Sequence, residues 1–412
     1  MTRFELDYPH HPRDHANATR GEMTAATAIR PQSVATATPF IAAILLSACG
    51  IAIGLLWDIS WHMSIGRDTF WAPPHMLEYV SGLVAGLSCG YVVLRTTFAG
   101  TQADTGVTVG FWGFRGPLGA WITIWGTFAM LVSAPFDDWW HNAYGLDVKI
   151  VSPPHMVLFW GMLGIVVGAL ALTASAQNRS AGARSELRDA WLYAIAGGVL
   201  CLIFANGTLE YSWPNAQHAP VFYIVWGGVF PLLLVGYSRA GRLKYPAAAA
   251  ALVFMMAWFA MGQVFRHVPA EPRLAPIWNP RTYLWPPYFP VLLIVPALAI
   301  DLVRRRLAGT SPWLVSFALS AAFVLLLLAV QWPLATFMVK GHSANWFFNA
   351  GEWPYFARPG PWQHDYWASQ RSNLGAPPVG VLMGGLALAV AAGTVSSRLG
   401  LAWGSWMSRV RR

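Results

Sequence analysis

Charged residues are scarce in this chain of 412 residues, of which only 11% are Asp, Glu, Lys or Arg. A soluble domain usually has about 25% charged residues. Hydrophobic residues make up 56% of the sequence, and the mean hydropathy is +0.44. This balance excludes an ordinary soluble domain and indicates a protein that lies in lipid.

Cysteine is also rare. The three cysteines, Cys49, Cys89 and Cys201, all fall within apolar runs. They predict neither a disulfide framework nor a zinc knuckle. The sequence contains no Cys-x-x-Cys or Met-x-x-Met motif, which disfavours a Cu(I) chaperone, because soft sulfur ligands suit that ion.

Long apolar runs recur along the whole chain. A transmembrane helix needs about 20 such residues, and backbone groups in lipid must be satisfied internally. We therefore expect an all-α, polytopic helical membrane protein with about ten transmembrane helices in tandem hairpins. The expected spans are 39–57, 76–96, 118–136, 156–175, 190–206, 219–238, 246–265, 284–303, 313–338 and 377–396.

The net charge of +9 has an uneven distribution. If the N-terminus is cytoplasmic, most of the 27 Lys and Arg residues fall in segments on the inner side of the membrane. This positive-inside pattern predicts both termini in the cytoplasm of a bacterial cell, in the inner membrane, and no nucleic-acid partner. Residues 1–38 are polar and lack an apolar signal sequence, so we expect a disordered cytoplasmic tail there.

Histidine outside that tail is confined to the expected outer loops and their junctions with helices. These histidines are His62, His75, His141, His155, His218, His267, His342 and His364. Imidazole is the commonest metal ligand. The periplasmic face is therefore where we expect metal binding.

Two outer segments share one pattern. Residues 58–75 read DISWHMSIGRDTFWAPPH, and residues 137–155 read DDWWHNAYGLDVKIVSPPH. Both contain Asp-x-x-Trp-His-x3-Gly-x-Asp and end in Pro-Pro-His. Proline suits the first turn of a helix, so each segment is expected to join the end of one helix to the start of the next.

Residues four apart share a helix face, so the Asp and first His of each segment can converge on one ion. The His after Pro-Pro would complete the set from the facing helix. Two imidazoles and one carboxylate form a three-ligand set with open positions. The two predicted metal sites are Asp58, His62 and His75, and Asp137, His141 and His155.

Each of these residues also has a purely structural explanation. An interfacial His can be only an amphipathic side chain, and the Asp residues can be helix caps. The joint occurrence of the same three residue types, twice at matched spacing, favours metal binding. Later outer loops repeat the pattern only loosely, as in Asn206, Glu210 and His218, and are weaker candidates.

Two acidic residues near the first predicted site are candidates for a supporting role. Glu78 follows His75 by one turn, so it can orient that imidazole or can hold two helices together by a hydrogen bond. Asp68 lies between the two histidines in sequence. Nearby tryptophans are explained by an interfacial aromatic belt, or by a dry wall around a reactive metal.

The first segment resembles the C subunit of the copper membrane monooxygenases, a family that includes particulate methane monooxygenase and ammonia monooxygenase. The matching residues are Asp58, Trp61, His62, Arg67, Asp68, Thr69, Phe70, Pro73, His75 and Glu78. In that family the Asp and both His are copper ligands. The resemblance therefore implies copper at Asp58, His62 and His75.

The second segment is similar to another site of that subunit, which has the form Asn-x3-His-x13-His. Here Asp137 stands where the family has Asn, and a carboxylate favours a harder or more oxidised metal. The resemblance covers roughly residues 40–175, so we expect a metal-binding four-helix unit over 39–176. Residues 177–412, with a long outer loop at 339–376, are additional helices outside it.

The resemblance implies an O2-activating copper monooxygenase, or a subunit of one, acting on a small or lipophilic substrate at the outer face. Asp58, His62 and His75 would be catalytic, and Glu78 and Asp68 would support the cofactor or transfer protons. The ligand set also suits iron or zinc. Expected partners are membrane lipid, further membrane or cupredoxin-like subunits and an electron donor. The alternative is a non-catalytic metal-binding membrane protein: a chaperone, assembly factor or transporter.

Overall fold

The computed structural model describes the chain from residue 38 to its end, with gaps. The described residues are 38–66, 71–100, 102–144, 152–214, 216–271, 273, 282–338, 343, 345–349 and 377–412. Within them the protein is helical apart from one small β-hairpin. The all-helical prediction is therefore confirmed for this part of the chain.

Nine of the described helices are long and apolar enough to cross a membrane, with mean hydropathies between 1.4 and 2.5. They are α1 (Thr38–Ser64), α2 (Pro73–Phe98), α4 (Leu118–Tyr144), α5 (Pro153–Arg179), α6 (Ala183–Gly207), α7 (Pro220–Ala240), α8 (Pro246–Phe265), α10 (Pro312–Met338) and α12 (Val379–Met407). The shorter elements are α3 (Gln102–Thr105), β1 (Val109–Phe111), β2 (Phe114–Gly116), the 3-10 turn η2 (Leu209–Tyr211) and α9 (Ile294–Arg306).

The expected span 284–303 is wrong as a continuous helix. Residues 284–292 form neither helix nor strand, and only α9, of 13 residues, follows. Pro286, Pro287 and Pro290 explain the difference, because proline has no backbone N–H to donate and its ring disfavours a helix interior. At 1.5 Å per residue α9 is about 20 Å long, which is shorter than the hydrocarbon core of about 30 Å.

Proline marks where several helices begin. α2, α5, α7 and α8 all have Pro in their first turn. At that position the missing N–H would have had no partner within the helix. The two Pro-Pro-His steps do start helices, and they place His75 and His155 in the first turns of α2 and α5.

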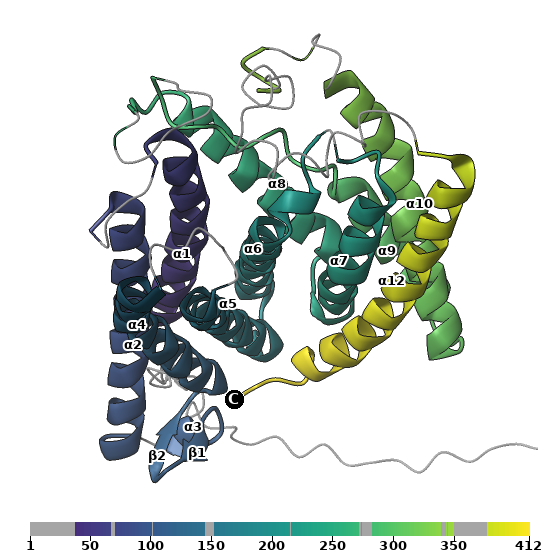
Figure 1. Cartoon of the computed structure of the whole chain (residues 1–412). Coiled ribbons are helices and arrows are strands. Elements are labelled where there is room, and N and C mark those ends of the chain that lie inside the picture. The colour runs from purple at the N-terminus through teal and green to yellow at the C-terminus, as the bar shows by residue number, and fades with distance from the viewer. Residues whose placement is uncertain are drawn as a thin grey trace, which may run out of the picture. The chain divides into compact units, whose positions relative to one another are not determined.

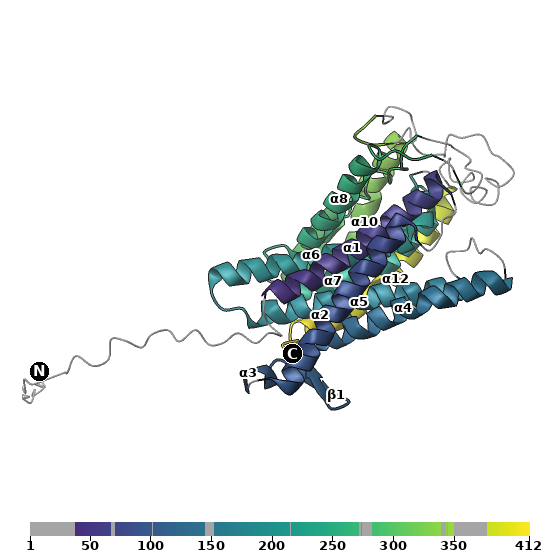
Figure 2. The same cartoon turned by 90° about the vertical axis from the view of Figure 1, so that its left-hand side faces the viewer.

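Helices that are neighbours in sequence pack together at one side of the bundle, and distant ones at the other. α1 packs on α2, and α4 on α5, whereas α12 runs along α7 and α10 (Figure 1). In Figure 2, α1 begins and α12 ends at one end of the bundle, while α1 ends and α2 begins at the opposite end.

The contact between α4 and α5 is unusually close because glycines face each other. A Cβ added at Gly119 would lie 2.5 Å from the carbonyl oxygen of Gly168, and one at Gly126 would lie 2.7 Å from that of Gly161. Small residues allow helix backbones to touch in membranes. This contact fixes the relative position of α4, which carries Asp137, and α5, which carries His155.

Candidate metal centres

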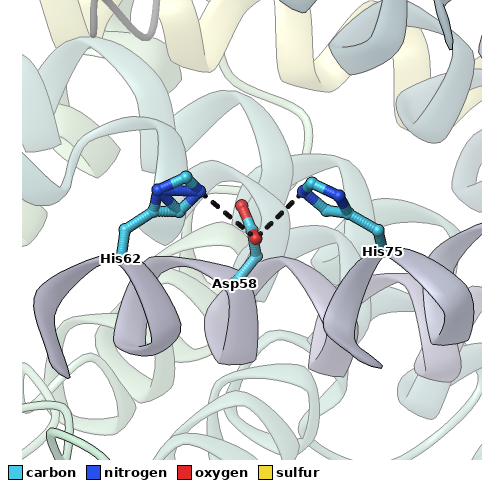
Figure 3. A group of neighbouring side chains, drawn as sticks. All are labelled: Asp58, His62 and His75. Atoms are coloured by element: carbon cyan, nitrogen blue, oxygen red, sulfur yellow. Dashed lines mark ion pairs between the residues drawn. The ribbon is translucent and has the colours of Figure 1, made fainter. Parts of the chain in front are cut away.

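The first predicted site is assembled from two helices. Asp58 and His62 lie one turn apart near the end of α1, and His75 lies in the first turn of α2. The Nε2 atoms of His62 and His75 are 3.5 and 3.2 Å from the same oxygen, Oδ1 of Asp58 (Figure 3). The three side chains therefore point toward one another from both sides of the carboxylate.

The second predicted site repeats this arrangement on α4 and α5. The Nε2 atom of His141 lies 3.2 Å from Oδ2 of Asp137, and that of His155 lies 3.6 Å from Oδ1. Here the imidazoles approach different oxygens of the carboxylate. The Asp137 side chain is 33% exposed, against 20% for Asp58, whereas His62, at 44%, is the most exposed of the six side chains.

The two donor sets fit a metal ion. Ligand nitrogens and oxygens lie about 2.0–2.2 Å from a bound transition metal, so neighbouring donors are about 3 Å apart. In each group one ligand atom per residue can be chosen so that all lie within 4.8 Å of one another. Oδ1 of Asp58 and Oδ1 of Asp137 are both buried and accept no hydrogen bond, which is costly unless a cation compensates them.

Glu78 lies directly beneath the first site. It belongs to α2 and is 2% exposed. Its side chain packs against α1, where Gly54 leaves room for it. A Cβ at Gly54 would lie only 2.5 Å from Cγ of Glu78. Gly54 is one turn before Asp58, so the carboxylate of Glu78 is placed one helical turn below the ligands. A buried acid in a membrane helix is costly and tends to be functional.

Tyr79 connects the surroundings of the two sites, and the sequence analysis missed it. Its hydroxyl is hydrogen bonded with Ser133 on α4, and the charges of Glu78 and Asp137 both act on it. Oγ of Ser133 also donates to the carbonyl oxygen of Met130 at 2.6 Å. The sequence carried one signal for this contact: Ser133 precedes Asp137 by one turn, which places Ser133 on the helix face of that ligand.

The tryptophans around the sites divide into two groups. Trp71 and Trp139 are 74% and 54% exposed, as expected for an interfacial aromatic belt. Trp61 instead packs against the hydrophobic core, next to His62 in sequence.

The weaker candidate set around His218 does not converge. Nε2 of His218 lies 2.9 Å from Oγ1 of Thr336, and its ring packs edge-on against Trp332. Burial lowers the pKa of His218, which favours its neutral form. Among the described residues only the two groups above bring three potential ligands together. Asp68, His342 and His364 lie outside the described residues.

Comparisons with known proteins add no assignment. No family model matches the chain, and no curated protein or solved structure is significantly similar to it. The functional interpretation is therefore based on the geometry of the two sites and on their motif residues.

Proposed function

We propose that this protein is a copper-binding integral membrane protein of the bacterial inner membrane, and that it is an O2-activating monooxygenase or a subunit of one. The first site, Asp58, His62 and His75, is the proposed reactive centre. One observation carries the proposal: two imidazole nitrogens lie 3.2 and 3.5 Å from a single buried carboxylate oxygen. The second site, on Asp137, binds a second ion.

The distribution of charge supports an outward-facing position of both sites. Basic residues lie at the opposite ends of the helices that carry the ligands: Arg95 in the last turn of α2 and Arg179 in the last turn of α5. Arg304, Arg305 and Arg306 end α9 in the same way. By the positive-inside rule these ends are cytoplasmic, which puts both termini in the cytoplasm and the metal sites at the periplasmic face.

Three protein ligands leave coordination positions open for a small molecule. Copper held there would supply the one-electron chemistry that O2 activation requires. The 44% exposure of the His62 side chain provides access from one side. Buried Glu78 is suitably placed to hold a proton near the site, and apolar residues around Trp61 limit water.

Copper is proposed from the resemblance of the motif, because two His and one carboxylate also suit iron(II) and zinc. An oxygenase at this site needs an electron donor, and a cupredoxin-like or further membrane subunit is the proposed source. A small or lipophilic substrate is proposed because it can reach the outer leaflet through the lipid.

Elemental analysis of the full chain purified in detergent tests metal binding. We expect about two metal equivalents in the unmodified protein, about one in His62→Ala or His141→Ala, and none in the double variant. His267→Ala is the matched control, because His267 is exposed and belongs to neither group. Unchanged metal content in the double variant would refute both sites.

Oxygenase activity needs a separate assay. The copper-loaded protein, given a chemical reductant, is expected to form an O2-dependent product from hydrocarbon, amine or lipid substrates, and Asp58→Ala is expected to abolish it. Full copper occupancy with no such product would instead support the non-catalytic metal-binding alternative.

A further inference from the structure

A mostly buried segment without helix or strand precedes α9. We call residues 282–293 the strap. Non-helical backbone within a membrane protein is tolerated only where the protein itself satisfies its polar groups. Trp285 and Tyr288 of the strap are 3% and 2% exposed, so their backbone partners must come from surrounding helices.

The strap is hydrogen bonded to α1 through the backbone of Trp285. The N–H of Trp285 donates to Oγ of Ser64 at 2.7 Å, and its carbonyl oxygen accepts a bond from Oγ of Ser60 at 2.6 Å. Oγ of Ser64 donates in turn to the backbone carbonyl of Ser60 at 2.7 Å. Both serines are buried, so these bonds are not exchanged with water.

The serines and the metal ligands occupy opposite faces of the same two turns of α1. Ser60 follows Asp58 by two residues, and Ser64 follows His62 by two. Two residues correspond to about 200° around a helix with 3.6 residues per turn. The end of α1 therefore presents its ligands on one face and is held by the strap on the other.

The strap is anchored in the C-terminal helices at two further points. Nε1 of Trp258 on α8 donates to the carbonyl oxygen of Tyr288 at 2.6 Å. The N–H of Leu292 donates to Oε1 of Gln331 on α10 at 2.9 Å. Gln331 is itself held by Gln217, at 2.6 Å. The strap thus joins α1 to a buried polar network that includes Gln331 and Gln217.

We propose that the strap positions the first metal site, and that Ser60 and Ser64 are positioning residues for Asp58 and His62. This inference rests on the proposed metal binding. By fixing the rotation of the last two turns of α1, the hydrogen bonds to Trp285 set the distance from Asp58 to His75. Helices outside the part of the chain that resembles the monooxygenase subunit thereby contribute to its reactive site.

The second site provides an internal comparison. It lies on α4 and α5, whose relative position is set by their own glycine contacts. The hydrogen bonds described above join the strap to α1, α8 and α10, and the part of α1 that they hold carries two ligands of the first site. Loss of the Trp285 contacts is therefore expected to affect the first site and not the second.

Copper titration of the full chain against a competing chelator tests this. In Ser60→Ala/Ser64→Ala we expect the first site to weaken by about tenfold, the lower end of the effect seen when partners that orient metal ligands are removed. The second site is expected to keep its affinity, and the Cu(II) spectrum of the first site to change. His141→Ala in both backgrounds isolates the first site for the measurement.

Ser320→Ala is the matched control, because its Oγ donates to the carbonyl oxygen of Val390 on α12 at 2.7 Å and is equally buried. It is expected to leave both sites unchanged. Ser64→Thr retains a hydroxyl and is expected to keep the first site's spectrum, whereas Ser64→Ala is not. Equal affinities for the first site in all these variants would overturn the inference. Absence of copper from the unmodified protein would instead overturn the proposed function.

Discussion

The carboxylate of Asp58 differs from that of Asp137 in how the imidazoles approach it. Both histidines of the first site lie near one oxygen of Asp58, whereas those of the second site divide between the two oxygens of Asp137. At Asp137 each imidazole approaches a different oxygen, His141 at 3.2 Å and His155 at 3.6 Å.

We predict that Asp137→Asn weakens Cu(II) binding at the second site by about tenfold and Cu(I) binding by less, because a carboxylate stabilises the more highly charged ion better than an amide does. Competition titrations in each oxidation state measure both effects. Asp138→Asn is the control, since Asp138 contacts Asn142 and belongs to neither metal group. Equal losses for both ions would contradict the role given to the charge.

The glycine beneath the first site gives a second prediction. Gly54→Ala brings a methyl group within 2.5 Å of Glu78, so we expect a loss of about 1–3 kcal/mol in the free energy of unfolding, as for other overpacked cores. Gly90→Ala on α2 meets open space and is expected to be neutral or slightly stabilising. Thermal unfolding in detergent compares them. Similar midpoints of thermal unfolding for Gly54→Ala and Gly90→Ala would show that the Glu78 side chain moves aside without cost.

At the scale of the helices, the sequence predicts the local structure of the sites but not their support. The i, i+4 spacing of Asp58 and His62, and the Pro-Pro-His steps, correctly indicate which residues share a face and where helices begin. The strap could not be foreseen, because residues 284–303 are as apolar as a transmembrane helix, and only the closely spaced prolines argued against one. Its partner Ser60 is 225 residues away from Trp285, a separation at which hydropathy carries no information.

Separation of α4 from α5 is predicted to remove the second site alone. Gly126→Leu places a side chain against the backbone of Gly161 and Ile165, which cannot move aside as a side chain can. His155 then withdraws from Asp137, and the copper content falls from about two equivalents to about one. A Cβ added at Gly384, which is exposed on α12, would meet nothing within 4 Å, so Gly384→Leu is the control. Two equivalents in Gly126→Leu would show that α5 adjusts without loss of the site.

At the scale of the whole molecule, both predicted sites and the strap lie toward one end of the helices, and the arginine-rich turns lie toward the other. This polarity yields a test of orientation that needs no metal. The native thiols give little background, because Cys89 and Cys201 are buried and Cys49 is partly buried. Single introduced cysteines can therefore report which end of the bundle faces the outside.

We predict that Tyr144→Cys, three residues after His141, reacts with a membrane-impermeant maleimide in intact spheroplasts, because Tyr144 is 67% exposed and lies at the metal-bearing end of α4. Arg184→Cys, at the exposed start of α6, is expected to react only after the membrane is permeabilised. The positive-inside rule gives this direction, because insertion retains arginine-rich ends in the cytoplasm. The reverse pattern would place both metal sites at the cytoplasmic face, where a periplasmic electron donor could not reach them, while leaving their geometry and metal content unaffected.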